Sequence, residues 1–547
     1  MRQAVPQFSL PSATHDDALF VKLARHILSG EWLGPYDALT LSKGAAFPIF
    51  IAASHIAGLP LKIAEHLFYL GTSLGMSQVA ARLARSRLLS PILFAAMAFN
   101  PMLWGTDFAH VYRDSLSATA TLAVLALSGR AYLVDASVLR PLHDRVAWLA
   151  ALGFTFGVYW LTREEREWIY PSLMLVLGYW VWNRLNVWRL ARQDPGQPRP
   201  RLSAEAAAIL IPITAFLVPL LSVHAMNARQ YGVFRDSDFR SRSFQSAYGA
   251  LSRIKPEHFA PYIVLPREAQ ERLYAVSPVA AELRPHLELG VGEDWRLTAC
   301  AMLALSDCTG VPSSHFVWAL RDSVAAAGHL HSAPEGDRFF DDLAADINAA
   351  CSENRLDCLP PRSGMAPPFR WRYLRDSIDA AWNYYQLVVY LGGEPIEVRQ
   401  SQGDPDAIAA FVRVTGGEVN VVPDRLRAAQ LAIVRRVAAA YLVVFPLLFP
   451  ICVPGLFAVA LRAAAKREGM AAVIFGGAIL LALVARVGVV SYVYATAIPL
   501  MSARYLAPAC LLAPAFVVLV SYLASAEAIQ WTAIQFRKRR SIPRPPS

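Results

Sequence analysis

The 547-residue chain has little charge for its length: Asp, Glu, Lys and Arg together make up 17%, whereas hydrophobic residues make up 55%. An ordinary soluble domain carries about 25% charged residues, so this composition excludes a typical soluble protein of this size. The apolar residues come in runs of about 20, the length that a helix needs to cross a hydrocarbon core roughly 30 Å thick. Because backbone groups in lipid must bond within their own segment, we expect these runs to be helices.

The chain also lacks a basic stripe with interleaved aromatic residues, although its formal net charge is +10. Its basic residues gather in short loops between apolar runs and in the tail Arg537, Lys538, Arg539 and Arg540. This distribution is typical of cytoplasmic loops, and we expect no nucleic-acid partner. Lysine is rare, with six residues against 46 arginines, which favours GC-rich coding and a bacterial source. Each retained lysine is therefore informative.

Nine apolar segments are candidates for transmembrane helices. Their approximate bounds are Leu61 to Ala81, Leu88 to Gly105, Ser115 to Val134, Val146 to Leu161, Ile169 to Trp188, Ala206 to Val223, Val437 to Leu461, Met470 to Val490 and Leu506 to Ala524. We predict an all-α polytopic membrane protein with about nine transmembrane helices.

The charge of the loops between these segments supports the count. Five basic groups fall on one side if the N-terminus is outside and the C-terminus inside, as the positive-inside rule requires. They are Arg82, Arg85 and Arg87; Arg140 and Arg145; Arg189 to Arg201; Arg462, Lys466 and Arg467; and the tail. Arg435 and Arg436 are a local exception. We therefore expect a multi-pass protein of the bacterial plasma membrane.

An outside N-terminus needs an explanation, because Met1 to Leu10 is neither a signal peptide nor a spanning helix. Either the short polar tail is translocated by itself, or the start codon is placed too late and a first helix is missing. We favour the second interpretation.

Five regions follow from this topology. They are an acidic extracytoplasmic loop with juxtamembrane helices at 1–60, six membrane helices at 61–224, a soluble extracytoplasmic domain at 225–430, three membrane helices at 431–526 and a basic cytoplasmic tail at 527–547. Within the soluble domain, Ser314 to Leu330, Asp337 to Leu356 and Trp371 to Leu391 have helical apolar spacing. Pro395 to Val398 and Glu418 to Val422 could be short strands. We expect the domain to be mainly helical.

Cysteine is scarce, and four of the six residues lie in this domain: Cys300, Cys308, Cys351 and Cys358. In an oxidising compartment they predict two disulfides, for which three pairings are possible. Our choice is local closure, 300 with 308 and 351 with 358, and the alternative is four free buried thiols. His329 and His331 resemble half a metal site, but without further ligands at regular spacing a surface helix end is the better interpretation.

Four groups of ionisable residues occur at the ends of the spans opposite the basic loops. They are His15, Asp16, Asp17 and Lys43; Asp107, His110, Arg113 and Asp114; the run Thr162, Arg163, Glu164, Glu165, Arg166 and Glu167; and Ser502, Arg504 and Tyr505. Ionisable groups near lipid are costly and usually face a cavity or one another. Four groups on one face therefore predict a single polar site.

Each group also has a simpler explanation, which stays open at this point. Asp16 or Asp17 could cap the amphipathic stretch Ala18 to Ser29, which Gly30 closes. Lys43 could be a snorkelling interfacial residue. The remaining residues could form an exposed capping pair (Arg113 and Asp114), a solvated turn (Arg163 to Glu167) and an interfacial anchor (Arg504).

Taken together, the groups fit sugar transfer from a polyprenyl phosphate. The phosphate leaves as an anion that needs cations, and Lys43, Arg113, Arg163 and Arg504 are suited to that role. The acceptor hydroxyl must lose its proton as it attacks, and Asp16 or Asp17 is suited to act as the base. A single displacement predicts inversion of the anomeric centre.

The same residues resemble a known superfamily. Asp16-Asp17, Gly30 to Tyr36, Lys43 and Phe47-Pro48 look like the first extracytoplasmic loop of the GT-C glycosyltransferases, which include protein O-mannosyltransferases and aminoarabinose transferases. The resemblance implies that Asp16 or Asp17 is the base, that Lys43 contacts the lipid phosphate, and that Asp114, Arg504 and Tyr505 belong to the site. It covers roughly Thr14 to Val223 and the final spans. This chain departs from the family in lacking a helix before the acidic loop and in carrying its large domain between spans.

We therefore expect a membrane glycosyltransferase with Asp16, Asp17, Asp114, Glu164 and Glu165 as catalytic candidates. The phosphate-binding candidates are Lys43, Arg113, Arg163, Arg504 and Tyr505. A divalent ion between Asp16, Asp17, Glu164 and Glu165 is conceivable, although no spacing requires one. The expected partners are a polyprenyl-phosphate sugar, a glycan, lipid or protein acceptor and membrane lipids. The alternatives are a transporter or flippase of lipid-linked sugars and a non-catalytic scaffold with a binding domain.

Overall fold

The computed structural model describes residues 2–134, 142–193, 202–258, 262–305, 308–362, 364–393, 396–499 and 501–540. Within them the fold is all-helical, and extended backbone pairs only in two isolated bridges, Ile254 with Cys358 and Ile263 with Pro312. Arg140, residues 194–201 of the third basic loop, Pro395 and residues 541–547 of the tail lie outside the described residues. Five short helical turns link longer helices: η1 Arg2–Ala4, α5 Thr106–Ala109, η4 Glu167–Ile169, η5 Asp238–Arg240 and η6 Trp371–Tyr373.

Five helices in this part of the chain are long and apolar enough to cross a membrane. They are Asp114–Val134 (α6 Asp114–Ser128 with its π-helical end η3 Gly129–Val134), α9 Leu202–Tyr231, α19 Arg425–Lys466, α20 Met470–Thr496, and Ala503–Ile529 (η7 Ala503–Leu506 with most of α21 Ala507–Arg540). They confirm five of the predicted spans. The helices α2 Ala46–Ile56 and α3 Leu61–Leu83 pass the same test together, with a bend of 105° between them. This pair accounts for the first predicted span.

The second predicted span, 88–105, is wrong as a continuous helix. Its helix α4 ends after ten residues, Leu89–Ala98, and a 3-10 turn, η2 Pro101–Trp104, follows. Pro101 has no N–H to donate and disfavours helical backbone at the residue before it, and Asn100 is extended there. The fourth and fifth predicted spans are helices, α7 Leu142–Trp160 and α8 Tyr170–Gln193, but they do not reach the same apolarity. The count of nine spans stays a prediction.

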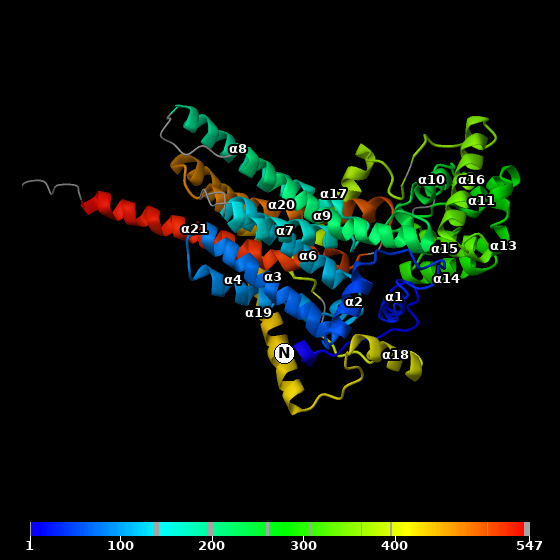
Figure 1. The fold of residues 1–547 in the computed structure, drawn as a ribbon, viewed down its shortest axis with the longest axis horizontal. Coiled ribbons are helices and arrows are strands. Elements are labelled where there is room, and N and C mark those ends of the chain that lie inside the picture. Colours follow the sequence, from blue (N-terminus) through cyan, green and yellow to red (C-terminus); the bar gives the residue numbers. More distant parts are fainter. Residues whose placement is uncertain are drawn as a thin grey trace, which may run out of the picture.

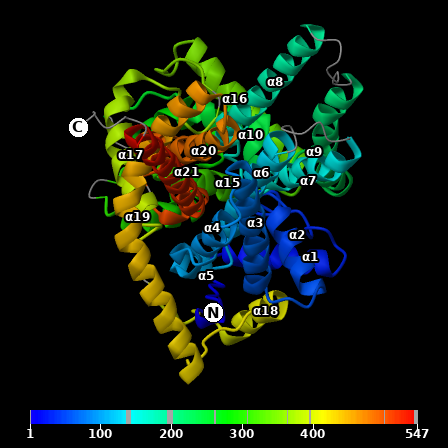
Figure 2. The ribbon, with the colours of Figure 1, turned by 90° about the vertical axis from the view of Figure 1, so that its left-hand side faces the viewer.

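The helices α7, α9, α20 and α21 run roughly along the long axis of the molecule, whereas α19 crosses it steeply (Figure 1). The helices α10 to α16 gather at one end of this axis, and the far ends of α8 and α21 lie at the other. In the turned view α19 lies along one edge, which agrees with the many exposed side chains on it (Figure 2). The bundle therefore has two distinct ends.

A helical domain, residues 238–358, has a hydrophobic core of its own. Its helices are α10 Arg242–Leu251, α11 Arg267–Val276, α12 Pro278–Ala281, α13 Arg284–Leu287, α14 Val291–Leu303, α15 Ser313–Ala326 and α16 Ala333–Ser352. The last two confirm the helices predicted at 314–330 and 337–356. Phe244, Phe316 and Phe340 are buried at its centre, where α10 packs against α16. The domain is thus a packed unit built from local helix pairs.

The rest of the predicted 225–430 segment packs elsewhere. The helix α17 Leu374–Val389, predicted from the apolar spacing at 371–391, packs against α20 and α21 and shares the core of the membrane helices. The helix α18 Pro405–Thr415 packs on α1 Asp17–Leu28 and α2. The predicted strands are wrong, because the described residues 396–398 and 418–422 form no ladder. The segment therefore divides among three hydrophobic cores: that of the helical domain, that of the membrane helices with α17, and a third with α1, α2 and α18.

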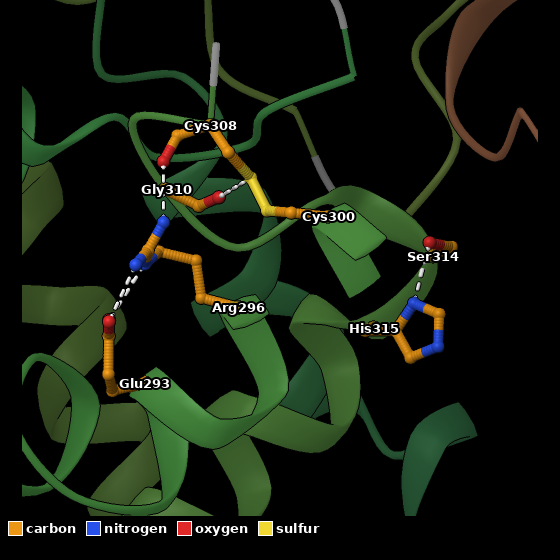
Figure 3. Close-up of a disulfide and its surroundings, with 7 residues drawn as sticks. All are labelled: Glu293, Arg296, Cys300, Cys308, Gly310, Ser314 and His315. Carbon is orange, nitrogen blue, oxygen red and sulfur yellow. Dashed lines mark hydrogen bonds and ion pairs between the residues drawn. A yellow bond between two sulfur atoms is a disulfide. The ribbon is translucent and has the colours of Figure 1, made fainter. Parts of the chain in front are cut away.

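Two disulfides close locally in the helical domain, Cys300 with Cys308 and Cys351 with Cys358, which confirms the predicted pairing. Cys452 and Cys510 are free and buried. Figure 3 shows the first disulfide beside Arg296, which pairs with Glu293 and donates to the Cys308 carbonyl at 3.0 Å. The disulfide thereby ties the end of α14 to the loop that leads into α15.

Candidate functional site

Asp16 stands at the start of α1 but does not cap it. Its carboxylate makes no capping hydrogen bond to the helix, and its backbone angles, φ −130° and ψ −99°, are unlike those of a usual cap residue. The carboxylate instead forms an ion pair with the Lys43 ammonium. The helix ends at Leu28, and Gly30, just after it, has a φ of +81° in the left-handed region that favours glycine. The capping alternative is therefore wrong for Asp16.

The two neighbouring aspartates have opposite surroundings. The Asp16 side chain is 39% exposed, whereas the Asp17 side chain is fully buried. Asp17 accepts hydrogen bonds from the Val111 amide at 3.3 Å and pairs with His110 Nδ1 at 3.2 Å. It fastens α1 to the loop before α6, whereas Asp16 remains open to a ligand.

Lys43 is buried at the centre of the site. Its ammonium donates to the Asp16 carboxylate and to the His15 carbonyl, and it lies 5.1 Å from the ring centre of Phe20 and 5.3 Å from that of Trp318. These fixed partners do not fit a lysine that reaches freely into the headgroup region.

Gly44 explains why the Lys43 loop can approach the loop after α7. A Cβ at this position would overlap the Leu161 carbonyl oxygen, which is backbone and cannot move aside easily. Only glycine permits this approach, which brings Lys43 next to the charged run 163–167.

The charged run 163–167 pairs with the start of α6. Arg113 makes a bidentate pair with Glu164, with Nη–O distances of 2.8 and 2.7 Å. Arg163 pairs with Asp114 and, at 2.6 Å, with Glu165. Planar two-point pairs of this kind fix the orientation of a guanidinium as well as its position. The run is thus held on α6 rather than exposed as a solvated turn.

The turn η7 adds cations from the other end of the sequence. The Arg504 guanidinium lies 4.0 Å from Asp114 and stacks on Tyr112 and Tyr505, with distances to the ring centres of 4.4 and 5.3 Å. The Arg163 guanidinium also lies over Tyr505, at 5.6 Å. The structure therefore brings residues 16, 43, 113, 163 and 504 into one network.

Arg486 belongs to this network, and the sequence analysis missed it. It lies inside the apolar helix α20, is only 2% exposed, and donates to the Tyr505 carbonyl at 2.7 Å. It also pairs with Glu165 at 3.4 Å. An arginine within an apolar span is itself a signal for a functional site, so the residue could have been found from the sequence. Its pairing with Glu165 and with the Tyr505 carbonyl could not have been found in this way.

The cations act strongly on the carboxylates. Partial burial raises the pKa of Asp16, but Lys43, Arg504 and Arg113 outweigh this effect and hold it at about 2. Burial likewise opposes the charge of Glu165, and Arg163, Arg486 and Arg113 nevertheless keep its pKa well below the usual range. Both groups are therefore ionised at neutral pH.

The carboxylates proposed to hold a divalent ion do not converge. Asp17 is turned toward His110, and Glu164 and Glu165 are engaged by arginines. No group of three His, Cys, Asp or Glu side chains among the described residues is placed to hold a metal ion. His329 pairs with Glu282 at 2.8 Å, just after α15 ends, as expected for a surface helix end. We derive no step through a metal.

Comparison with known proteins gives a limited result. No protein-family model matches the chain, and no curated protein matches it. Among solved structures, ArnT from Cupriavidus metallidurans bound to undecaprenyl phosphate is similar, with 15% identity, a TM-score of 0.29, and coverage of 94% of this chain and 74% of that chain. The same protein in the apo state gives a TM-score of 0.28 with the same identity and coverage. At such TM-scores the likeness supports no conclusion about the site, and the geometry above carries the proposal below.

Proposed function

We propose that the protein is a GT-C-like membrane glycosyltransferase that moves a sugar from a polyprenyl-phosphate donor to an acceptor hydroxyl with inversion. The observation that carries this proposal is the network at the domain-bearing end of the apolar helices. It combines a partly exposed carboxylate, Asp16, with cations that face it from three separate parts of the chain. This is the pair of functions that the reaction needs, a base and a site for an anionic leaving group.

The cations would bind the donor phosphate. Lys43 and Arg504 each act on Asp16, and Asp114 lies between Arg163 and Arg504. The network contains five cations and four carboxylates, which leaves a formal surplus of one positive charge: Lys43, Arg113, Arg163, Arg486 and Arg504 against Asp16, Asp114, Glu164 and Glu165. A phosphate that enters finds cations already oriented, so that little reorganisation remains to be done in the transition state.

Asp16 would act as the base once the donor is bound. In the free protein Lys43 is paired with Asp16. When Lys43 turns to the donor phosphate, Asp16 loses its strongest partner, its pKa rises, and it becomes a better proton acceptor. The acceptor oxygen then bonds to the anomeric carbon as the carbon–phosphate oxygen bond breaks. The hydroxyl proton goes to Asp16, and polyprenyl phosphate leaves with the bonding electrons.

The other predicted carboxylates take a positioning role in this scheme. Asp114, Glu164 and Glu165 each bind an arginine of the network. They hold the guanidinium groups where the phosphate arrives. Asp17 is fully buried, so the proposal assigns the base to Asp16 alone.

A small pocket of about 30 Å³ beside the network has room for only a few atoms of the donor's lipid, next to its phosphate. It is lined mostly by apolar side chains, among them Met102, Leu442 of α19 and Ala503, and Asp107 stands at its wall. Ala503 directly precedes Arg504, and Leu442 lies on a helix that is long and apolar enough to span the bilayer. An isoprenoid chain that enters here would present its phosphate to Arg504. We place the acceptor side and the helical domain outside the cytoplasm, in line with the disulfides.

The proposal is tested with the purified protein in lipid and a donor labelled in its sugar. Wild type should release polyprenyl phosphate, and Asp16→Asn should lower turnover by about 10³-fold while donor binding persists. The control is Asp37→Asn, which removes another aspartate–lysine pair nearby in the sequence, Lys22 of α1 with Asp37 of the loop that follows it, at 2.5 Å. If Asp16→Asn turned over like wild type, the assignment of the base would be wrong. Movement of intact donor across the bilayer without release would indicate a transporter instead.

A further inference from the structure

The helical domain contacts the proposed site at several points: Arg240 pairs with Glu167, Trp318 lies over Lys43, and the imidazole of His15 packs into the domain beside the proposed base. The imidazole stands between Trp295 of α14 and Trp318 of α15, with edge-to-face ring distances of 4.7 and 4.9 Å. Its Nε2 lies 3.1 Å from a carboxylate oxygen of Asp322, also on α15. Edge-to-face packing and a charge-assisted hydrogen bond both depend on orientation, so together they fix the ring.

Two of the residues that contact His15 are also hydrogen-bonded to each other. The Trp295 indole N–H donates to the same Asp322 oxygen at 2.8 Å. The second ring nitrogen of His15, Nδ1, lies 2.9 Å from the Thr14 hydroxyl. Both nitrogens of the imidazole therefore have a partner, and the ring serves as a joint between the acidic loop and the helical domain.

This joint lies directly beside the proposed base. The carbonyl of His15 accepts a hydrogen bond from Lys43, and the next residue is Asp16, the ion-pair partner of the same ammonium. Trp318 contacts both sides of the joint, because its ring packs on His15 and also lies 5.3 Å from the Lys43 ammonium. A shift of the imidazole would therefore move the carbonyl, the carboxylate and the ammonium together.

The helix α15 is anchored at two further points. The Ser313 hydroxyl at its start donates to the Ala497 carbonyl just after α20, and the buried Arg321 donates to the Ala38 carbonyl and pairs with Asp238. The same helix thus contacts the membrane bundle, the loop that carries Lys43 and the loop that carries Asp16. It is a rigid element that spans the parts of the site.

We propose that His15 is a positioning residue through which the helical domain holds the Asp16–Lys43 pair in its reactive geometry. This inference rests on the proposed function. His15 itself does not touch the reacting atoms; it acts on them through its own backbone carbonyl and through the adjacent residue. Reacting groups tolerate little displacement, since an error of about 1 Å can cost about 10²-fold in rate.

The test replaces the residues of the helical domain that hold His15 and leaves His15 itself in place. Asp322→Ala and Trp318→Ala should each lower kcat by about 10- to 100-fold. Trp318→Phe, which retains an aromatic ring against His15, should recover most of the loss. The matched control is Glu282→Ala, which removes the carboxylate partner of His329 in the same domain and should leave kcat unchanged.

A pH profile separates positioning from a general loss of structure. The charged groups that act on Asp16 are Lys43, Arg113 and Arg504, and they hold its pKa at about 2. Once the joint is broken Lys43 loosens, so the acid limb of kcat/KM should move up toward about 4, the ordinary value for aspartate. An unmoved acid limb with wild-type kcat in Asp322→Ala would overturn the inference, as would an equal loss in Glu282→Ala.

A readout without turnover keeps this inference apart from the proposed function. The rate at which acetic anhydride modifies Lys43, followed by mass spectrometry, should rise in Asp322→Ala and Trp318→Ala but not in Glu282→Ala. Unchanged Lys43 reactivity would refute the positioning role even in an active enzyme. Suppose that Lys43 reactivity rose in these variants while wild type released no polyprenyl phosphate. The positioning role of His15 would then be supported, and the proposed reaction would be wrong.

Discussion

The two ends of α3 carry cations in contrasting settings. At its start Lys62 is buried, pairs with Glu65 at 2.9 Å and donates to the His110 carbonyl, close to the proposed site. In its last turn and just after its end, Arg82, Arg85 and Arg87 are exposed. A helix of 23 residues separates these ends by about 35 Å. Cations of one chain thus serve two purposes.

The difference lies in what fixes each set. Exposed basic loops set the orientation of the protein in the bilayer through the number of their Lys and Arg residues. A single one of these residues can therefore be moved or lost without changing the orientation. Buried cations have paid a desolvation cost that only well-placed carboxylates offset, so their geometry is fixed by partners. At the site end, these partners come from distant parts of the sequence, as with Arg486 and Glu165. Position rather than number should therefore decide function there.

The largest effect on stability should come from removing a buried cation of the site end. Arg486→Met leaves the Tyr505 carbonyl without its donor and Glu165 with one partner fewer, and should destabilise the fold by about 2 kcal/mol, measured by thermal or denaturant unfolding in detergent. The double variant with Glu165→Gln should lose less than the sum of the two single variants, because the residues are in contact. Strict additivity would show that the pair is not coupled.

Lys43→Met should weaken binding of polyprenyl phosphate by about 100-fold, because a buried charge that meets the phosphate is removed. It should also raise the pKa of Asp16 from about 2, since Lys43 is the cation with the largest effect on it. A depressed carboxylate pKa stabilises the fold fully above about pH 4 and loses that contribution as the pH falls toward 2. The variant should therefore lose less stability than wild type across this window. An unchanged affinity, measured by calorimetry, would contradict the role of Lys43.

The smallest effect should come from the far end. Joint replacement of Arg82, Arg85 and Arg87 by Gln should leave kcat and donor affinity unchanged and alter stability by about 0.5 kcal/mol or less. The same change should lower the fraction of molecules inserted with the expected orientation, measured by protease access to the loops. If the correctly inserted variant lost much of its turnover, the exposed cations would also serve the reaction, and the two ends of α3 would not differ in the role of their cations.

Much of the fold was predictable because it follows local patterns. The helices α15 and α16 show apolar spacing within one or two turns, and Cys300 and Cys351 have their disulfide partners eight and seven residues away. The break at Asn100-Pro101 was missed because average hydropathy takes no account of a single backbone restriction. The placement of α17 was missed for another reason: its apolar spacing shows that one face is buried but not against which helices, and its partners α20 and α21 lie far away in the sequence.

Most members of the charged network were predicted from the sequence, but Arg486 and the pairing of the charges were not. Charge at the ends of apolar runs was enough to select Asp16, Lys43 and Arg504, because such groups are costly near lipid. The sequence could not separate Asp16 from Asp17, since the difference is the burial of one side chain under His110. Nor could it connect His15 to Asp322, which lie far apart in the chain and meet only when the helical domain docks.

The position of Arg504 has a consequence for synthesis. Asp16 is made well before Arg504, which lies at the start of the apolar helix Ala503–Ile529, yet both act on the same site. A growing chain therefore holds an acidic loop without its full set of cations until the final helix has been inserted. On the proposed function, chains that end before Arg504 should bind the donor phosphate weakly, because one of its cations has not yet been made.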